Sequence, residues 1–187
     1  MLGIAALVSA SMFVPSALGG SASTCLQPPV SGRVVAPYVA PPCPYCAGHR
    51  TVDFASVLGE AVLAPVAGTV AFYGFVGGRL YITIDPTDSP VFAPGTLVTV
   101  GGLLLDDVSA EGPNPRRGDP VRQGERVGDA GGWPITLSVR RLGSNDPYVD
   151  PRPILGRWRV APRLVPRSGS WRSPPPQWTC PAGTKSR

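Results

Sequence analysis

Glycine and proline are the feature that most restricts what this chain can fold into. Its 187 residues include 23 Gly and 24 Pro, the two residue types with the lowest helix propensity. Long helices therefore cannot dominate, which excludes an all-helical bundle, a coiled coil and a polytopic membrane protein. The 43% of hydrophobic residues is still enough to bury the core of one principal domain.

The middle of the chain is a series of short strands separated by turns. Runs rich in β-branched and aromatic residues lie between Gly, Pro, Asn and Asp, and no apolar stripe repeats every 3.6 residues. The pair Gly77-Gly78 favours a two-residue hairpin. We predict an all-β fold with a compact antiparallel sheet core, either a sandwich or an open barrel. The expected strands are residues 33–38, 51–54, 61–64, 69–76, 79–84, 96–100, 125–127 and 135–141.

The N-terminal segment has the character of an export signal. Residues 1–24 contain no charged side chain and combine an apolar run with a stretch of small residues, which is typical of a secretory signal peptide. We therefore expect a secreted or cell-envelope protein, with residues 25–32 as a linker and residues 33–156 as the sheet domain. The alternative for the apolar run is a buried N-terminal strand.

The C-terminal segment, residues 157–187, is basic and rich in Pro, Arg and Trp. The consecutive prolines 174–176 favour an extended conformation, so we expect an extended tail. Its Arg and Trp side chains suit an anionic wall polymer or contact with a membrane surface; the alternative is a solvated tail without a ligand. Nucleic acid is not an expected partner, because the chain carries an export signal.

The four cysteines are Cys25, Cys43, Cys46 and Cys180. An even number after an export signal favours disulfides. Three pairings are possible, and one of them joins the ends of the domain and separately closes the CPYC loop. A redox-active CPYC motif is the rival interpretation, although no helix-forming stretch follows it to activate a thiol.

Four ordered segments carry a resemblance to a known family. They read GHRTVDFA at residues 48–55, VLAPVAGTV at residues 62–70, GDPVRQGERVG at residues 118–128 and VDPRP at residues 149–153. Together they resemble the M23 peptidases, the lysostaphin- and LytM-like family. Members are secreted β-sheet zinc metalloendopeptidases that cut peptide cross-links in peptidoglycan, so the resemblance implies an M23-like β-sheet core.

The first segment contains two candidate metal ligands, His49 and Asp53. Residues four apart on a strand project from one face, and imidazole nitrogen and carboxylate oxygen both bind zinc at about 2.0–2.2 Å. A hydrolytic zinc site needs a third protein ligand as well as a bound water. In the family this ligand is the second His of an HxH motif, and the first His assists catalysis together with another His upstream.

The chain lacks these other histidines, because His49 is its only His. The resemblance places the HxH positions at Pro134 and Thr136, and the upstream His at Gly102. Thr is a poor zinc ligand, and neither Pro nor Gly can transfer a proton. General acid–base assistance worth roughly 10²–10⁴-fold is therefore missing.

The resemblance and the lost histidines lead to one functional hypothesis. We expect an exported, catalytically inactive M23-like domain that binds peptidoglycan or another anionic cell-wall polymer, or regulates a cell-envelope partner. His49 and Asp53 would form a vestigial or weak zinc site, with either no cofactor or weakly bound zinc. Thr136 and Arg140 are the candidates for lining a ligand groove.

The alternative is an active zinc metalloendopeptidase that cleaves peptidoglycan cross-links with a non-standard third ligand. Asp106, Asp107 and Asp129 are candidates for that ligand. A further ligand set combines His49 with thiolates of Cys43 or Cys46, which the CxxC-xx-H spacing allows and an oxidising compartment opposes.

Overall fold

The computed structural model describes residues 25–43, 45–86, 89, 92–104, 114–144, 147–159 and 177–182. The expected signal peptide, Asp106, Asp107 and most of the expected tail lie outside these residues. Within them, no helix has the length and the apolar character needed to cross a membrane. The helical content of the described residues is one short 3-10 turn, η1 (Arg152–Ile154).

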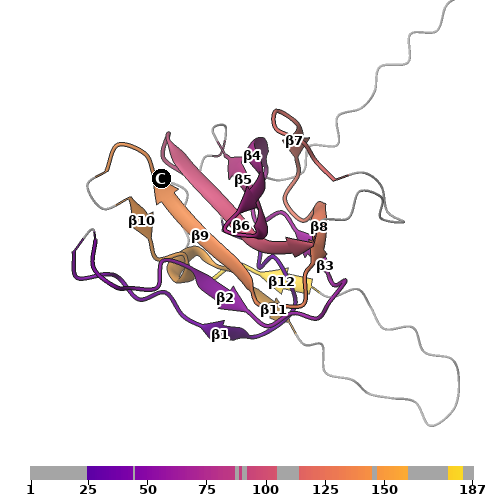
Figure 1. Ribbon diagram of the computed structural model, residues 1–187, viewed down its shortest axis with the longest axis horizontal. Coiled ribbons are helices and arrows are strands. Elements are labelled where there is room, and N and C mark those ends of the chain that lie inside the picture. Colours follow the sequence, from indigo (N-terminus) through magenta and orange to yellow (C-terminus); the bar gives the residue numbers. More distant parts are fainter. Residues whose placement is uncertain are drawn as a thin grey trace, which may run out of the picture.

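The fold is a ten-stranded antiparallel sheet that is not closed into a barrel (Figure 1). The prediction of an all-β fold with an antiparallel core is therefore confirmed. Seven strands run across the sheet in the order β1 (Val34–Ala36), β2 (Val52–Phe54), β9 (Ile135–Arg141), β6 (Thr96–Leu104), β5 (Arg79–Asp85), β4 (Gly68–Val76) and β7 (Pro120–Val121). The other three strands lie off this path. β10 (Tyr148–Val149) pairs with β9. β3 (Ala61–Leu63) pairs with β8 (Arg126–Ala130), and β8 also pairs with β6.

The alternation of side chains gives the sheet two different faces. One face is apolar and buried, as on β9, where Ile135 and Leu137 are 0% exposed. The intervening residues on the other face, Thr136 and Ser138, are half-buried and polar. The hydrophobic core therefore fixes the register of the strands, because a slip of one residue would turn every apolar side chain to the polar face.

All eight strands expected from the sequence are present. The β4–β5 hairpin turns at Gly77 and Gly78, which have positive φ angles of 57° and 79°, as the two-residue turn requires. Two short strands of the sheet, β7 and β10, were not predicted, because two-residue pairings leave no alternation to detect.

The chain segments on either side of the expected domain differ from expectation. Residues 25–32 form part of the core instead of a linker, with Leu26 and Val30 at 0% and 1% exposure. The first residues of the expected tail form a strand, β11 (Arg157–Arg159), which pairs with β12 (Gln177–Thr179) as a second, two-stranded sheet. The indole N–H of Trp158 on β11 donates to the Val30 carbonyl at 2.6 Å, so the two segments hold each other in place.

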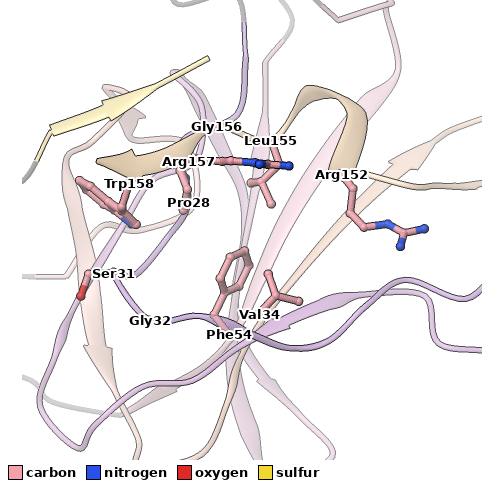
Figure 2. A pocket seen from close by; sticks show the side chains of 10 residues that line it. All are labelled: Pro28, Ser31, Gly32, Val34, Phe54, Arg152, Leu155, Gly156, Arg157 and Trp158. Atoms are coloured by element: carbon pink, nitrogen blue, oxygen red, sulfur yellow. The ribbon is translucent and has the colours of Figure 1, made fainter. Parts of the chain in front are cut away.

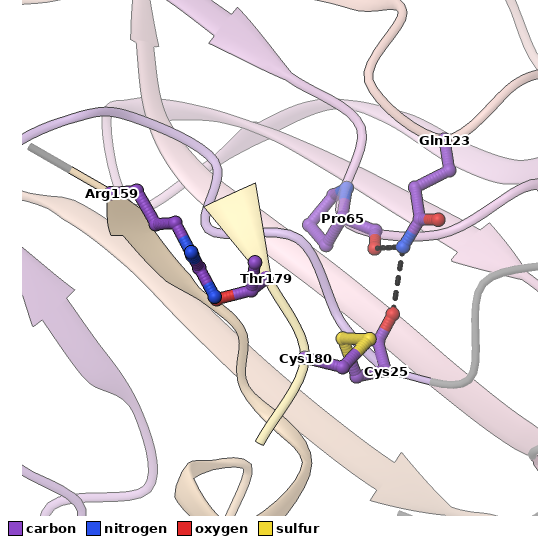
Figure 3. The surroundings of a disulfide bond; sticks show 6 residues. All are labelled: Cys25, Pro65, Gln123, Arg159, Thr179 and Cys180. Atoms are coloured by element: carbon purple, nitrogen blue, oxygen red, sulfur yellow. Dashed lines mark hydrogen bonds between the residues drawn. A yellow bond between two sulfur atoms is a disulfide. The ribbon is translucent and has the colours of Figure 1, made fainter. Parts of the chain in front are cut away.

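A disulfide between Cys25 and Cys180, 155 residues apart in sequence, joins these segments. Figure 3 shows the bond beside the side chain of Gln123, whose amide donates to the carbonyl oxygens of Cys25 at 2.7 Å and Pro65 at 2.9 Å. The second disulfide is Cys43–Cys46. Of the three possible pairings, the structure has the one that joins the two ends and closes the CPYC loop.

Candidate functional site

The candidate site lies on the polar face, where one row of register partners crosses four neighbouring strands. We call this set the site row: Asp53 on β2, Thr136 on β9, Gly101 on β6 and Tyr81 on β5. Directly opposed residues of antiparallel strands have Cβ atoms about 4.5–5.5 Å apart. The sheet therefore brings together two predicted site residues, Asp53 and Thr136, from segments more than 80 positions apart.

His49 joins the row from the segment that leads into β2. Its backbone forms a two-way bridge with Val39, through N–H to O bonds of 2.8 and 2.9 Å. The Cys43–Cys46 disulfide closes the loop between the two bridged residues. The side chain of His49 is 37% exposed and that of Asp53 16% exposed, so the pair is accessible from solvent.

His49, Thr51 and Asp53 project from the same side of the chain and form a compact hydrogen-bonded group. The Thr51 hydroxyl donates to Asp53 Oδ1 at 2.6 Å and lies 3.0 Å from His49 Nε2. His49 Nε2 is itself 3.2 Å from Asp53 Oδ1. Because the single hydroxyl proton of Thr51 goes to the carboxylate, the Thr51 oxygen can only accept from the imidazole. This arrangement favours the tautomer with the proton on Nε2 of His49, and that hydrogen bond would have to be given up before Nε2 could bind a metal.

The opposite half of the row offers no comparable ligand. Thr136 presents a neutral hydroxyl, and Pro134 is exposed in the turn before β9. Within the described residues, no three His, Cys, Asp or Glu side chains lie together in a way that could hold a metal ion. The spacing of His49 and Asp53 is close to the roughly 3.3 Å that separates two tetrahedral zinc ligands. His49 and Asp53 are thus spaced as two zinc ligands would be, and no third His, Cys, Asp or Glu of the described residues lies beside them to complete a three-ligand centre.

The position facing Thr136 on β6 is Gly101, and an aromatic ring covers it. A Cβ atom added to Gly101 would lie 2.1 Å from Cε1 of Tyr81 and 2.8 Å from Oγ1 of Thr136. The ring of Tyr81 thus occupies the space that any side chain at Gly101 would need. Gly102, where the resemblance places the upstream His, has φ of +94°, and its added Cβ would lie 2.8 Å from the Pro134 carbonyl oxygen. Neither glycine has room for a proton-transferring side chain in this arrangement.

The other candidate ligands are engaged elsewhere or lie outside the described residues. Asp129 forms a two-pronged ion pair with Arg126, with a 3.0 Å bond from Nε and a 2.5 Å bond from Nη2. Cys43 and Cys46 are joined to each other, so neither offers a thiolate. Arg140 is exposed on β9, four residues from Thr136 on the same face and therefore roughly 13 Å away along the strand.

Sequence reasoning missed three members of the site: Thr51, Gly101 and Tyr81. Thr51 could have been found, because it lies midway between His49 and Asp53 and shares their face of the strand. Tyr81 and Gly101 depend on the register of β5 against β6, which one sequence does not reveal.

Comparisons with known proteins support the fold. Neither a protein-family model nor a curated protein sequence matches the chain. Among solved structures, lysostaphin in solution aligns with a TM-score of 0.55 and 20% identity over 83% of this chain and 64% of its own. Csd3 of Helicobacter pylori aligns with a TM-score of 0.54 and 20% identity over 78% of this chain, which spans 38% of the length of Csd3. The antimicrobial peptidase lysostaphin from Staphylococcus simulans aligns with a TM-score of 0.50 and 20% identity over 71% of this chain and 54% of its own.

These likenesses show that the chain has an M23 peptidase-like, LytM-like fold, as the four sequence segments predicted. At about 20% identity they establish the fold alone. Any activity depends on the residues of the site row and on the hydrogen-bonded group of His49, Thr51 and Asp53.

Proposed function

We propose that this protein is an exported, non-catalytic M23-like domain that binds cell-wall peptidoglycan across the polar face of its sheet. The observation that carries the proposal is the asymmetry of the site row. His49 and Asp53 lie 3.2 Å apart, while their partners across the sheet are a hydroxyl, a glycine and a tyrosine ring. Such a site keeps hydrogen-bonding groups for a ligand and lacks the groups that activate water.

The chemistry of the polar face suits a polymer of sugars and peptides. Thr136 and Ser138 on β9 lie beside Thr99 on β6, whose hydroxyl is 2.9 Å from that of Thr83 on β5. Hydroxyl groups can both donate and accept, so this row can pair with peptide amides and with sugar hydroxyls. The exposed guanidinium of Arg140 can pair with a carboxylate of a stem peptide.

Export is part of the same proposal. Both disulfides join residues within the described chain, and disulfides persist in oxidising compartments outside the cytoplasm. Peptidoglycan would be met in that same compartment. A weakly bound zinc ion at His49 and Asp53 would be compatible with this function, since peptidoglycan can be bound without the activation of a water molecule.

A sedimentation assay with insoluble purified peptidoglycan tests the proposal. We expect the wild-type chain to co-sediment, and the double variant Thr136→Val with Ser138→Ala to bind about tenfold more weakly, because each lost hydrogen bond costs about 0.5–1.5 kcal/mol. Thr179→Val, which removes a hydroxyl from the separate β11–β12 sheet, is the matched control and should bind like wild type. Equal binding by all three proteins, or none by wild type, would refute binding at this face.

The competing function is an active zinc endopeptidase. The spacing of His49 Nε2 and Asp53 Oδ1 favours it, because two zinc ligands stand at a similar distance. It requires release of new amino groups from peptidoglycan, and this release must stop when zinc is chelated. Such a result would overturn the non-catalytic assignment even if the sedimentation assay succeeds.

A further inference from the structure

Strand β1 is an open edge of the sheet. It ends the strand order, and β2 is its sole partner among the described strands; Figure 1 shows the outer side of β1 facing away from the sheet. Val34 and Val35 on this strand are 42% and 43% exposed. Proteins usually protect such edges with charge, proline or a cover, because the unpaired backbone is a template for another strand.

The backbone of Val34 is the part of the edge that is turned outward. The carbonyl of its neighbour Arg33 accepts a hydrogen bond from the Ala55 N–H at 2.9 Å, so Arg33 faces the inner partner. In an antiparallel pair the inward and outward residues alternate. The N–H and C=O of Val34 therefore point away from β2, where an added strand would find them.

A cavity of about 420 Å³ opens beside the same strand. Figure 2 shows Val34 and Phe54 on one side of it, and Leu155 and Arg157 on the other, in the segment that leads from η1 into β11. Val34 and Phe54 are register partners, so both side chains point to the core face. Phe54 is 2% exposed and Val34 is 42% exposed, which shows that the core layer stops short of the edge. The lining residues are Pro28, Ser31, Gly32, Val34, Phe54, Arg152, Leu155, Gly156, Arg157 and Trp158.

The lining of this cavity carries positive charge, and two carboxylates stand next to it: Asp150 beside Arg152, and Glu60, which accepts a hydrogen bond from the Ser31 hydroxyl at 3.0 Å. None of its ten lining residues is acidic, and two are arginines. Arg152 is already paired with Asp150, at 2.7 Å between Nη2 and Oδ2, and this hydrogen bond lowers the pKa of the Asp150 carboxyl. Arg157 is exposed on β11, and Arg33 precedes Val34 on the edge. An occupant with an apolar side chain beside a carboxylate would complement both the walls and the rim.

We propose that an extended peptide segment of a partner protein adds to β1 as a further strand, placing one apolar side chain in the cavity and an acidic side chain beside Arg157. Main-chain hydrogen bonds to Val34 would supply part of the affinity, and the cavity would select the sequence, as in other cases of strand addition. This surface is separate from the site row, so it does not depend on peptidoglycan binding. The partner segment would have an apolar and an acidic residue two positions apart, so that both side chains point to the face that carries the cavity.

Selection from a phage-displayed library of random dodecapeptides tests this inference on the full chain. We expect enriched peptides to carry an acidic residue two positions from an apolar one, because side chains at i and i+2 of a strand share a face, and to shift the amide resonance of Val34 on binding. Val34→Pro removes the outward N–H without touching the bonds to β2, a position where an edge strand tolerates proline. It should abolish binding, and Arg157→Glu should weaken it at least about tenfold.

Arg116→Glu is the matched charge control, because Arg116 is exposed in the turn before β7, at the other end of the strand order. It should leave affinity unchanged, and thermal unfolding checks that each variant folds. Should Val34→Pro be destabilised, Arg157→Glu decides the outcome alone. Failure to enrich any peptide, or enrichment of peptides insensitive to Arg157→Glu, would overturn the proposal. So would a dimer of the wild-type chain that Val34→Pro dissociates, because it would assign the edge to a second copy.

Discussion

Two rows of residues cross the same four strands side by side, one on each face of the sheet. The core row is Val52, Leu137, Val100 and Ile82, which are register partners and are each 0% exposed. The site row, one residue along, is Asp53, Thr136, Gly101 and Tyr81. The core row is uniform in chemistry, whereas the site row is acidic at one end and aromatic at the other. Both rows depend on the same pairing of β2, β9, β6 and β5.

The contrast between the two rows shows that the residues that hold the strands in register are different from the residues that form the candidate site. Burial of apolar side chains on the core face sets the register. On the polar face Asp53, Thr136 and Tyr81 are only partly buried, so a change of side chain there should disturb the register less. The backbone presents Thr136 directly opposite Asp53, at the position where the resemblance places the third zinc ligand of the family. A fold of this kind can keep its M23-like shape without its reaction.

The largest effect is expected in the core row. Leu137→Ala should lower the free energy of unfolding by about 2–5 kcal/mol, because it removes buried methyl groups and leaves a cavity. Thr136→Ala, the adjacent change on the polar face, should cost less than about 1 kcal/mol. Chemical denaturation of both variants measures the contrast. Similar losses would mean that the polar face also holds the register.

A steric test concerns Gly101. Its Cβ atom would meet the ring of Tyr81 at 2.1 Å, so Gly101→Ala should destabilise the protein by about 1–3 kcal/mol. Adding Tyr81→Ala should cancel most of that loss. A double-mutant cycle tests this by comparing the unfolding free energies of the wild type, the two single variants and the double variant. Additive effects would show that Tyr81 does not occupy the space above Gly101.

A third ligand can be restored from β9. Thr136→His should raise zinc affinity by more than about tenfold, because a third ligand, an imidazole nitrogen, would face Asp53 directly. Ser138→His is the matched control: it lies on the same strand and face but is paired with Thr99 instead of Asp53. Isothermal titration calorimetry with zinc measures the affinity of the two variants and of the wild-type chain. If the control gains as much affinity, the binding is not due to the His49–Asp53 pair.

The smallest effect on stability is expected for Thr51, whose hydroxyl lies between His49 and Asp53. Thr51→Val removes the 2.6 Å bond to Asp53 and should cost about 0.5–1.5 kcal/mol of stability. Nitrogen-15 NMR of the wild-type chain should show His49 protonated at Nε2, as the hydrogen bonds require. A neutral imidazole with its proton on Nδ1 would mean that the Thr51 hydroxyl donates to Nε2 of His49 instead of to Asp53.

The sequence predicted the parts of this molecule that depend on local pattern. Alternation located the strands from residue 33 to residue 141, and the Gly77-Gly78 pair located a hairpin. The spacing of His49 and Asp53 placed them on one face, where the structure has them 3.2 Å apart.

What escaped prediction depends on contacts between distant segments. β11 and β12 pair across 17 intervening residues, and neither has a length or alternation that marks a strand. Leu26 belongs to the core because it bridges to Leu155, which no local signal indicates. Tyr81 covers Gly101 because of the register of β5 against β6. The cavity beside Val34 is lined by residues from separate parts of the chain, among them Pro28, Phe54 and Leu155.

The central claim is that one imidazole and one carboxylate hold no catalytic zinc. The most direct test is the zinc content of the purified wild-type chain after equilibration with zinc and dialysis, measured together with peptidoglycan cross-link cleavage. We expect well under one zinc per chain and no cleavage that chelation abolishes. One tightly held zinc per chain, lost in His49→Ala and Asp53→Ala and accompanied by chelator-sensitive cleavage, would contradict the claim.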